Sequence, residues 1–340
     1  HLRLDRRFVP DGDRAIGFFG INLSPALLGV GFIVGFNIGA LMLSGGALSW
    51  WVFIPFYNMF LQDHDPVLAA ELVGLEADAA ANLIWGRQIR YIGVGAMLIG
   101  GLWSLWSLRK SLLSGVKTGM ALRGASMIGV PDTERDLPMT MIMSGIVLFV
   151  LPLFALYYVV VDSLGIAFTM AVIMVVAGFV FSSVSGYMAG LVGSSNNPVS
   201  GITISTILFA SLILLAIMGA GSTVGPVAAI MIGAVICNAA AIAGDNLQDL
   251  KAGQLIGATP WRQQVMLGIG ALASAAVMAP VLNLLLEAYG IGTPAREGVN
   301  ALAAPQATLM ASVASGIFGN GLPWNMVATG AVVGAIVITL

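Results

Sequence analysis

Two aspartates and a lysine in a polar stretch of this chain are the side chains best suited to carrying a proton. Asp245 and Asp249 are four residues apart, so on a helix they share a face. Carboxylates held this close favour binding of a proton, and partial burial strengthens that tendency. Lys251 does not share their face on a regular helix, but a bend would bring it near enough to pair with a carboxylate. We expect proton coupling at these three residues; the alternative is a solvated amphipathic loop.

A second polar stretch, residues 193–203, lies between two strongly apolar segments. Its proline and glycines break helices, and the freed backbone groups then need partners. In a membrane such breaks are tolerated where they line a wet cavity, and in transporters they bind substrates and ions. The alternative is a polar loop at the membrane surface. The expected substrate-binding side chains are Tyr187, Ser194, Ser195, Asn196, Asn197, Ser200, Thr203 and Asn238.

Asn238 and Tyr187 are included because each lies about two helical turns before one of the polar stretches. We expect the break near Asn197 and the carboxylates near Lys251 to converge on one aqueous pocket enclosed by apolar helices. Other asparagines in apolar runs are expected to hydrogen-bond between helices.

Several chemistries are excluded by missing motifs. None of the three lysines follows a glycine, so a Walker A phosphate loop is absent. The two histidines, His1 and His64, do not form a zinc metallopeptidase motif, and no cofactor or metal site is expected. Gly244-Asp245 is similar to the Gly-Asp element of intramembrane proteases, but a second aspartate within a facing span is lacking. A non-transporting membrane enzyme of that kind is the alternative function.

Composition indicates the elements that position these residues. The chain is 58% hydrophobic and only 9% charged, whereas soluble domains carry about 25% charged residues. The apolar residues form blocks of about 20, the length that crosses a bilayer. We therefore predict an all-α polytopic membrane protein with about eight transmembrane helices and two re-entrant or broken hairpins. The eight spans are expected at residues 24–43, 89–108, 139–161, 165–192, 204–220, 224–243, 265–286 and from 323 onward.

The two hairpins are expected at residues 50–57 and 304–318, which are too short to cross comfortably. Lysine and arginine collect in cytoplasmic loops, which places residues 109–138 and 245–264 inside and the acidic residues 62–81 outside. Residues 1–20 are a surface segment. The whole of 1–340 is expected to be one transmembrane transporter domain, cut at both ends from a longer protein.

Several stretches resemble the oligopeptide transporter (OPT) superfamily, most closely its bacterial branch. They are Ser24-Pro25-Ala26-Leu27-Leu28-Gly29-Val30-Gly31, Glu134-Arg135-Asp136-Leu137-Pro138, Asn197-Pro198-Val199-Ser200-Gly201-Ile202-Thr203, residues 243–253 and Gly257-Ala258-Thr259-Pro260. The resemblance implies proton-coupled symport of small peptides or of metal–chelator complexes. In the eukaryotic peptide branch a Lys-Ile-Pro-Pro-Arg motif follows Asp-Leu-Lys. Here only Pro260 and Arg262 could correspond to it, which leaves metal-chelate uptake open.

The function expected from the sequence is secondary active transport, as symport of protons with small oligopeptides or peptide-like metal chelates. The expected partners are that substrate, protons and the lipid bilayer; a homodimer is left open and no nucleic acid is expected. The location expected is the inner (plasma) membrane, crossed many times.

Overall fold

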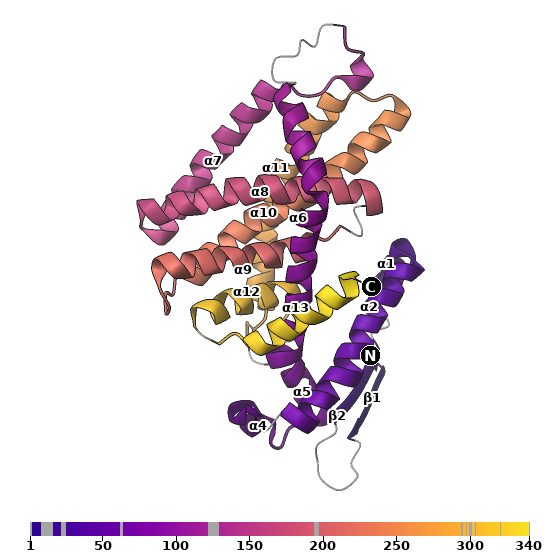
Figure 1. The fold of residues 1–340 in the computed structure, drawn as a ribbon, viewed down its shortest axis with the longest axis vertical. Coiled ribbons are helices and arrows are strands. Elements are labelled where there is room, and N and C mark those ends of the chain that lie inside the picture. The colour runs from indigo at the N-terminus through magenta and orange to yellow at the C-terminus, as the bar shows by residue number, and fades with distance from the viewer. Residues whose placement is uncertain are drawn as a thin grey trace. The chain divides into compact units, whose positions relative to one another are not determined.

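The computed structural model describes residues 2–7, 16–21, 25–61, 64–121, 129–193, 197–293, 295, 296, 298, 301, 302, 304–319 and 321–339. The chain forms two compact units. The first unit holds His1–Gly100 and Pro323–Leu340, and the second holds Gly101–Leu322. Helix α6 (Arg90–Ala121) contributes residues to both (Figure 1). That residues 1–340 act as one transporter domain stays a prediction.

The predicted all-α polytopic membrane protein is confirmed. Among the described residues, seven helices are long and apolar enough to cross a membrane, and Trp324–Thr339 is a shorter apolar helix. Large apolar side chains such as Leu148 and Leu284 are exposed on these helices, as expected for surfaces that face lipid. The seven helices are Phe36–Leu61, Ala77–Lys110, Asp132–Val161, Leu164–Leu191, Val199–Met218, Gly225–Ile256 and Pro260–Ala288.

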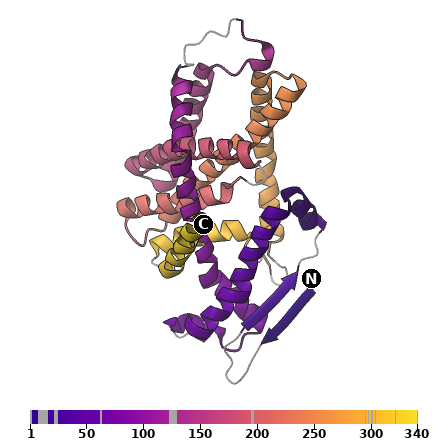
Figure 2. The same cartoon turned by 45° about the vertical axis from the view of Figure 1, so that its right-hand side comes forward.

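The first unit begins with a feature that the sequence analysis described only as a surface segment. Strands β1 (Leu2–Arg7) and β2 (Ile16–Ile21) pair antiparallel, with Leu2 opposite Ile21 (Figure 2). Strand β2 lies against the helices that follow it. This hairpin is the one sheet among the described residues.

The expected re-entrant hairpin at residues 50–57 is wrong. These residues lie inside one continuous helix, Phe36–Leu61, built from α2 (Phe36–Ala47), a π-helical turn, α3 (Ile54–Phe56) and a second π-helical turn. Pro55 has no backbone N–H to donate within the helix. The wider π-helical turns on either side of it change the hydrogen-bonding pattern locally, so the helix continues through the proline. The aromatic run is too short to cross alone, but together with the apolar residues before it, it forms a helix of 26 residues.

The expected span at residues 24–43 is interrupted. Helix α1 (Pro25–Val34) ends at Gly35, which has a φ of 82° that only glycine adopts readily, and α2 starts at the next residue. At 1.5 Å per residue, α1 spans about 15 Å and the 26-residue helix about 39 Å. One helix long enough to cross therefore lies between residues 21 and 62, as the predicted topology requires, but it is the second helix rather than the first.

The remaining helices of the first unit form its core. Helices α4 (Pro66–Leu72) and α5 (Ala77–Ile84) pack with α3, and Ile54, Ala81 and Ile84 are fully buried there. A π-helical turn (Trp85–Ile89) joins α5 directly to α6. Helix α13 (Trp324–Thr339) packs closely on α6, because Gly330 lies against the backbone of Ile92.

The second unit is organised around one central helix. Helix α10 (Gly225–Ile256) lies beside α8 (Leu164–Val192) and α9 (Val199–Met218), and α12 (Pro305–Phe318) covers α9 and α10 (Figure 1). Helix α7 (Met139–Val161) packs on α8. Helix α11 (Pro260–Ala288) follows α10 after a short turn and has no buried residue.

Two boundaries in the second unit differ from expectation. Helix α9 starts at Val199 rather than residue 204, so the break after α8 is shorter than expected. Helix α10 continues through residues 245–256, which the sequence analysis placed in a polar connection between spans. The helix therefore includes charged and polar residues beyond the expected span. Each of these residues has the backbone N–H that the next helical hydrogen bond needs, so the helix continues up to Gly257.

The second expected hairpin, residues 304–318, is a short helix. Helix α12 has 14 residues, or about 21 Å, which is less than the roughly 30 Å hydrocarbon core. Helix α12 packs inside the unit, where the ring of Phe318 lies against Gly225. The backbone N–H of Gly221 donates to the carbonyl of Phe318 at 2.9 Å. A re-entrant position for α12 stays a prediction.

Candidate functional site

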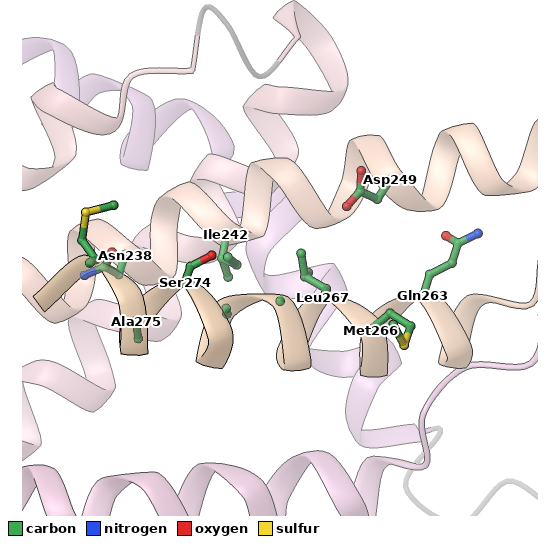
Figure 3. A pocket seen from close by; sticks show the side chains of 11 residues that line it. Asn238, Ile242, Asp249, Gln263, Met266, Leu267, Ser274 and Ala275 are labelled. Carbon is green, nitrogen blue, oxygen red and sulfur yellow. The ribbon is translucent and has the colours of Figure 1, made fainter. Parts of the chain in front are cut away.

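An open cavity of about 780 Å³ lies between α10 and α11, and most of the residues that line it are exposed (Figure 3). Its volume falls within the roughly 300–1,000 Å³ typical of small-molecule sites. The lining is mostly apolar, with a few polar groups, and Asp249 is its one charged side chain. The lining residues are Asn238, Ile242 and Asp249 from α10 and Gln263, Met266, Leu267, Gly270, Ala271, Ser274, Ala275 and Met278 from α11.

The turn between α10 and α11 places these two faces opposite each other. Gly257 has a φ of 74°, and the N–H of Ala258 donates to the carbonyl of Gly253 at 2.8 Å. This is the Schellman arrangement that ends helices at a glycine. Pro260 then occupies the first turn of α11, where its missing N–H costs nothing. The motif 257–260 therefore makes α10 and α11 antiparallel neighbours.

The start of α11 is also tied to residues 135–137. The Nε2 of Gln264 donates to Asp136 Oδ1 at 3.2 Å, and its Oε1 accepts from the N–H of Leu137 at 3.2 Å. The N–H of Trp261 donates to the carbonyl of Arg135 at 3.1 Å. These three contacts hold the first turn of α11, and with it the adjacent Gln263.

Of the expected site residues, Asp249 and Asn238 line the cavity. Asn238 donates one N–H of Nδ2 to the carbonyl of Ala234 at 2.9 Å, which leaves its second N–H and Oδ1 for a ligand. Asp245 is exposed and shares the helix face of Asp249 one turn earlier, but it does not line the cavity.

Lys251 does not meet the aspartates through a bend. It lies in the regular part of α10, and its Nζ donates to Gln254 Oε1 at 2.8 Å. Two residues after Asp249, it points about 200° around the helix from that carboxylate. A role in proton coupling for Asp245, Asp249 and Lys251 stays a prediction.

The Asn197 side chain is held on a different face of α10. Its Nδ2 donates to Ser185 Oγ at 2.6 Å, and Ser185 Oγ in turn donates to the carbonyl of Ala240. The same carboxamide lies against Gly244, where an added Cβ would be 2.7 Å from Nδ2. Gly244 is five residues before Asp249, or roughly 140° around α10. The structure therefore brings both polar stretches to α10 but does not put Asn197 among the residues that line the cavity.

The other residues of the break are placed as follows. Ser194, Ser195 and Asn196 lie outside the described residues. Ser200 is helical and exposed, and Thr203 is buried with its hydroxyl donating to the carbonyl of Val199 at 2.8 Å.

Tyr187, on α8, is 42% exposed, and it is not among the cavity residues. Its role, like those of Ser194–Asn196, Ser200 and Thr203, stays a prediction.

Sequence reasoning did not single out Gln263, Ser274 or Ser185. Gln263 and Ser274 are eleven residues apart, a spacing that puts both on one face of a helix, and this periodicity could have identified them. Ser185 gave no such signal, because a serine inside an apolar helix usually bonds to its own backbone. Among the described residues, no group of three or more histidine, cysteine or acidic side chains could hold a metal ion.

Comparison with known proteins gives two matches. The family model described as OPT oligopeptide transporter protein matches residues 15–340. A protein of Haemophilus influenzae named "Putative oligopeptide transporter" is 37% identical over 342 residues, which cover 94% of this chain. They cover 53% of that protein, so the chain spans about half the length of the curated relative that it matches. No solved structure matches.

Proposed function

Since the chain belongs to the OPT oligopeptide transporter family, we propose that it takes part in proton-driven uptake of small peptides across the plasma membrane. The observation that carries this proposal is the α10–α11 cavity, which is large enough for a small ligand and presents one carboxylate. Peptide-like metal chelates are the second substrate class. They bring their own metal ligands and therefore need no metal site in the protein.

In this proposal Asp249 is the group that exchanges the proton. A coupling group must change charge during the cycle and must also affect substrate binding, because coupling is a free energy shared by two ligands. Asp249 meets the second condition, since it faces the cavity. Asp245, one turn away on the same helix face, places a second carboxylate near Asp249.

The test is uptake of labelled trialanine by proteoliposomes that contain the full-length protein under an imposed inward proton gradient. Asp249→Asn removes the titrating group with little change in shape. We expect gradient-driven uptake to fall at least about tenfold, within the range of typical coupling energies. Exchange of trialanine without a gradient is expected to remain detectable with a raised KM, because the substitution removes the one charge of the cavity and leaves the rest of its lining in place.

Asp162→Asn is the matched control. Asp162 is exposed between α7 and α8 with a φ of 50°, a conformation that asparagine tolerates well. It should leave uptake unchanged. Equal gradient-driven uptake by the wild type and by Asp249→Asn would reject the role of Asp249. If the wild type took up neither trialanine nor chelated iron, the proposed function would be rejected.

A further inference from the structure

The polar groups of the cavity lie toward its two ends. Asp249 and Gln263 lie at the end near the α10–α11 turn, whereas Asn238 and Ser274 lie toward the other end (Figure 3). Between them the lining is apolar, with side chains such as Ile242 and Leu267. A ligand of this cavity therefore has polar groups at its ends and apolar groups along its length, with its positive charge facing Asp249.

At the polar end, Asp249 and Gln263 offer hydrogen-bond acceptors, whereas the donor group of Gln263, Nε2, lies against Gly253. Gln263 Oε1 is buried and has no hydrogen-bond partner. An ionised carboxylate such as that of Asp249 only accepts hydrogen bonds. The cationic side chains nearby are engaged elsewhere, because Lys251 donates to Gln254 and the Arg262 guanidinium lies 5.5 Å from the centre of the Trp261 ring.

The position of Gln263 is built into the helix pair. Its amide lies directly over Gly253, where any Cβ would collide with Nε2. The Schellman turn at Gly257 and the contacts of Gln264 with residues 136 and 137 fix the first turns of α11. Gln263 therefore lies against α10 for two reasons: Gly253 leaves room for its side chain, and the turn at Gly257 positions the start of α11.

We propose that Asp249 and Gln263 bind the free amino terminus of a peptide, with Gln263 as a specificity-determining residue. An ammonium group carries three N–H donors and a positive charge. Asp249 supplies the opposite charge, and Gln263 Oε1 supplies an acceptor that otherwise stays unpaired in a buried place, which is unfavourable. The apolar lining then contacts the peptide side chains. This inference rests on the proposed function, and it favours peptides over chelates whose amines are bound to a metal.

The experiment compares trialanine with N-acetyl-trialanine, which lacks the ammonium group, in proteoliposomes of the full-length protein under a proton gradient. For the wild type we expect acetylation to raise KM at least about tenfold, since sites built around a substrate N–H reject analogues that lack it. Gln263→Leu replaces the amide by an apolar side chain of similar size without an acceptor. It should raise KM for trialanine, leave kcat largely unchanged, and reduce the KM ratio of N-acetyl-trialanine to trialanine below about threefold. Gln263→Glu keeps the acceptor and should keep the preference.

Gln306→Leu is the matched control, because it makes the same change at an exposed residue of α12 that does not line the cavity. The Gln306→Leu protein should behave as the wild type. Gradient-driven uptake with equal KM for the two peptides in the wild type would overturn this inference and leave the proposed function standing. A Gln263→Leu protein that keeps the full preference would also overturn it. No uptake of either peptide would overturn the proposed function itself.

Discussion

Asn197 shows how one carboxamide can anchor a broken helix. The chain leaves α8 at Gly193, whose φ is 82°, and Asn197 then returns to α8 and α10 through Ser185 and the carbonyl of Ala240. This contact is available only because Gly244 has no Cβ. Membrane proteins hold helices together through such side-chain hydrogen bonds and small residues, since lipid provides no hydrophobic drive between helices.

Gly244→Ala is expected to lower the thermal stability of the protein in detergent by about 1 kcal/mol, the scale of an interhelical hydrogen bond in a membrane. The added methyl group would lie 2.7 Å from Asn197 Nδ2 and so displace the carboxamide from Ser185. In an Asn197→Ala background the same substitution should cost little. Additive losses in a double-mutant cycle of Gly244→Ala and Asn197→Ala would contradict this contact.

At the scale of elements, glycine spacing identifies close helix contacts only where a partner helix is present. Gly330 and Gly334 on α13 lie against the backbone of α6 at Ile92 and Ala96. A Cβ added to Gly186 on α8 would lie 3.2 Å from the side chain of Leu247 on α10. An added Cβ at Gly190, one turn after Gly186, meets no heavy atom within 4 Å.

Gly330→Ala is expected to destabilise the first unit by about 1–3 kcal/mol, because its methyl group would collide with the Ile92 carbonyl and force α13 away from α6. Gly190→Ala is the control and should be neutral or stabilising by up to about 1 kcal/mol, since alanine favours a helix more than glycine does. Thermal unfolding in detergent, followed by circular dichroism, measures both. Equal melting temperatures for Gly330→Ala and the wild type would show that α13 does not pack on α6 in this way.

Apolar block length predicted most of the helices, because burial in lipid requires about 20 apolar residues and satisfied backbone groups. Met139–Val161 was predicted with its exact bounds. The failures are at residues whose local sequence conflicts with the helix they occupy. The short aromatic run at residues 50–57 suggested a hairpin where a continuous helix passes through it, and the polar residues 245–256 suggested a loop where α10 continues.

The site was predicted in part for a similar reason. Asp249 and Asn238 could be identified because polar side chains beside apolar spans are conspicuous. The spacing of Gln263 and Ser274 puts both on one helix face, but the place of Gln263 beside α10 depends on Gly253 and on the turn at Gly257, which the sequence alone does not reveal. Asn197 was expected to share one pocket with the carboxylates, but it contacts α10 on a different face. Side-chain direction around a helix cannot be known before the neighbours of that helix are known.

At the scale of the whole molecule, the account depends on the α10–α11 cavity as the place where substrate binds. The exposed apolar surfaces of α7 and α11 are suited to lipid, whereas the cavity combines apolar lining with Asp249, Asn238 and Gln263. Pocket chemistry of this kind, a few polar groups in an apolar concavity, is typical of small-molecule sites.

The most direct measurement is substrate protection of a cysteine placed in that cavity. Ser274 lines it, and Cys237 is the one cysteine of the chain, so Ser274→Cys is combined with Cys237→Ser in the full-length protein. Thr223→Cys in the same background is the control, because Thr223 is exposed before the start of α10, about four helical turns from the nearest cavity residue on that helix, Asn238. We predict that saturating trialanine slows maleimide labelling of Ser274→Cys at least about fivefold and leaves labelling of Thr223→Cys unaffected. Equal labelling of Ser274→Cys with and without trialanine, in protein that still takes up trialanine, would contradict the account.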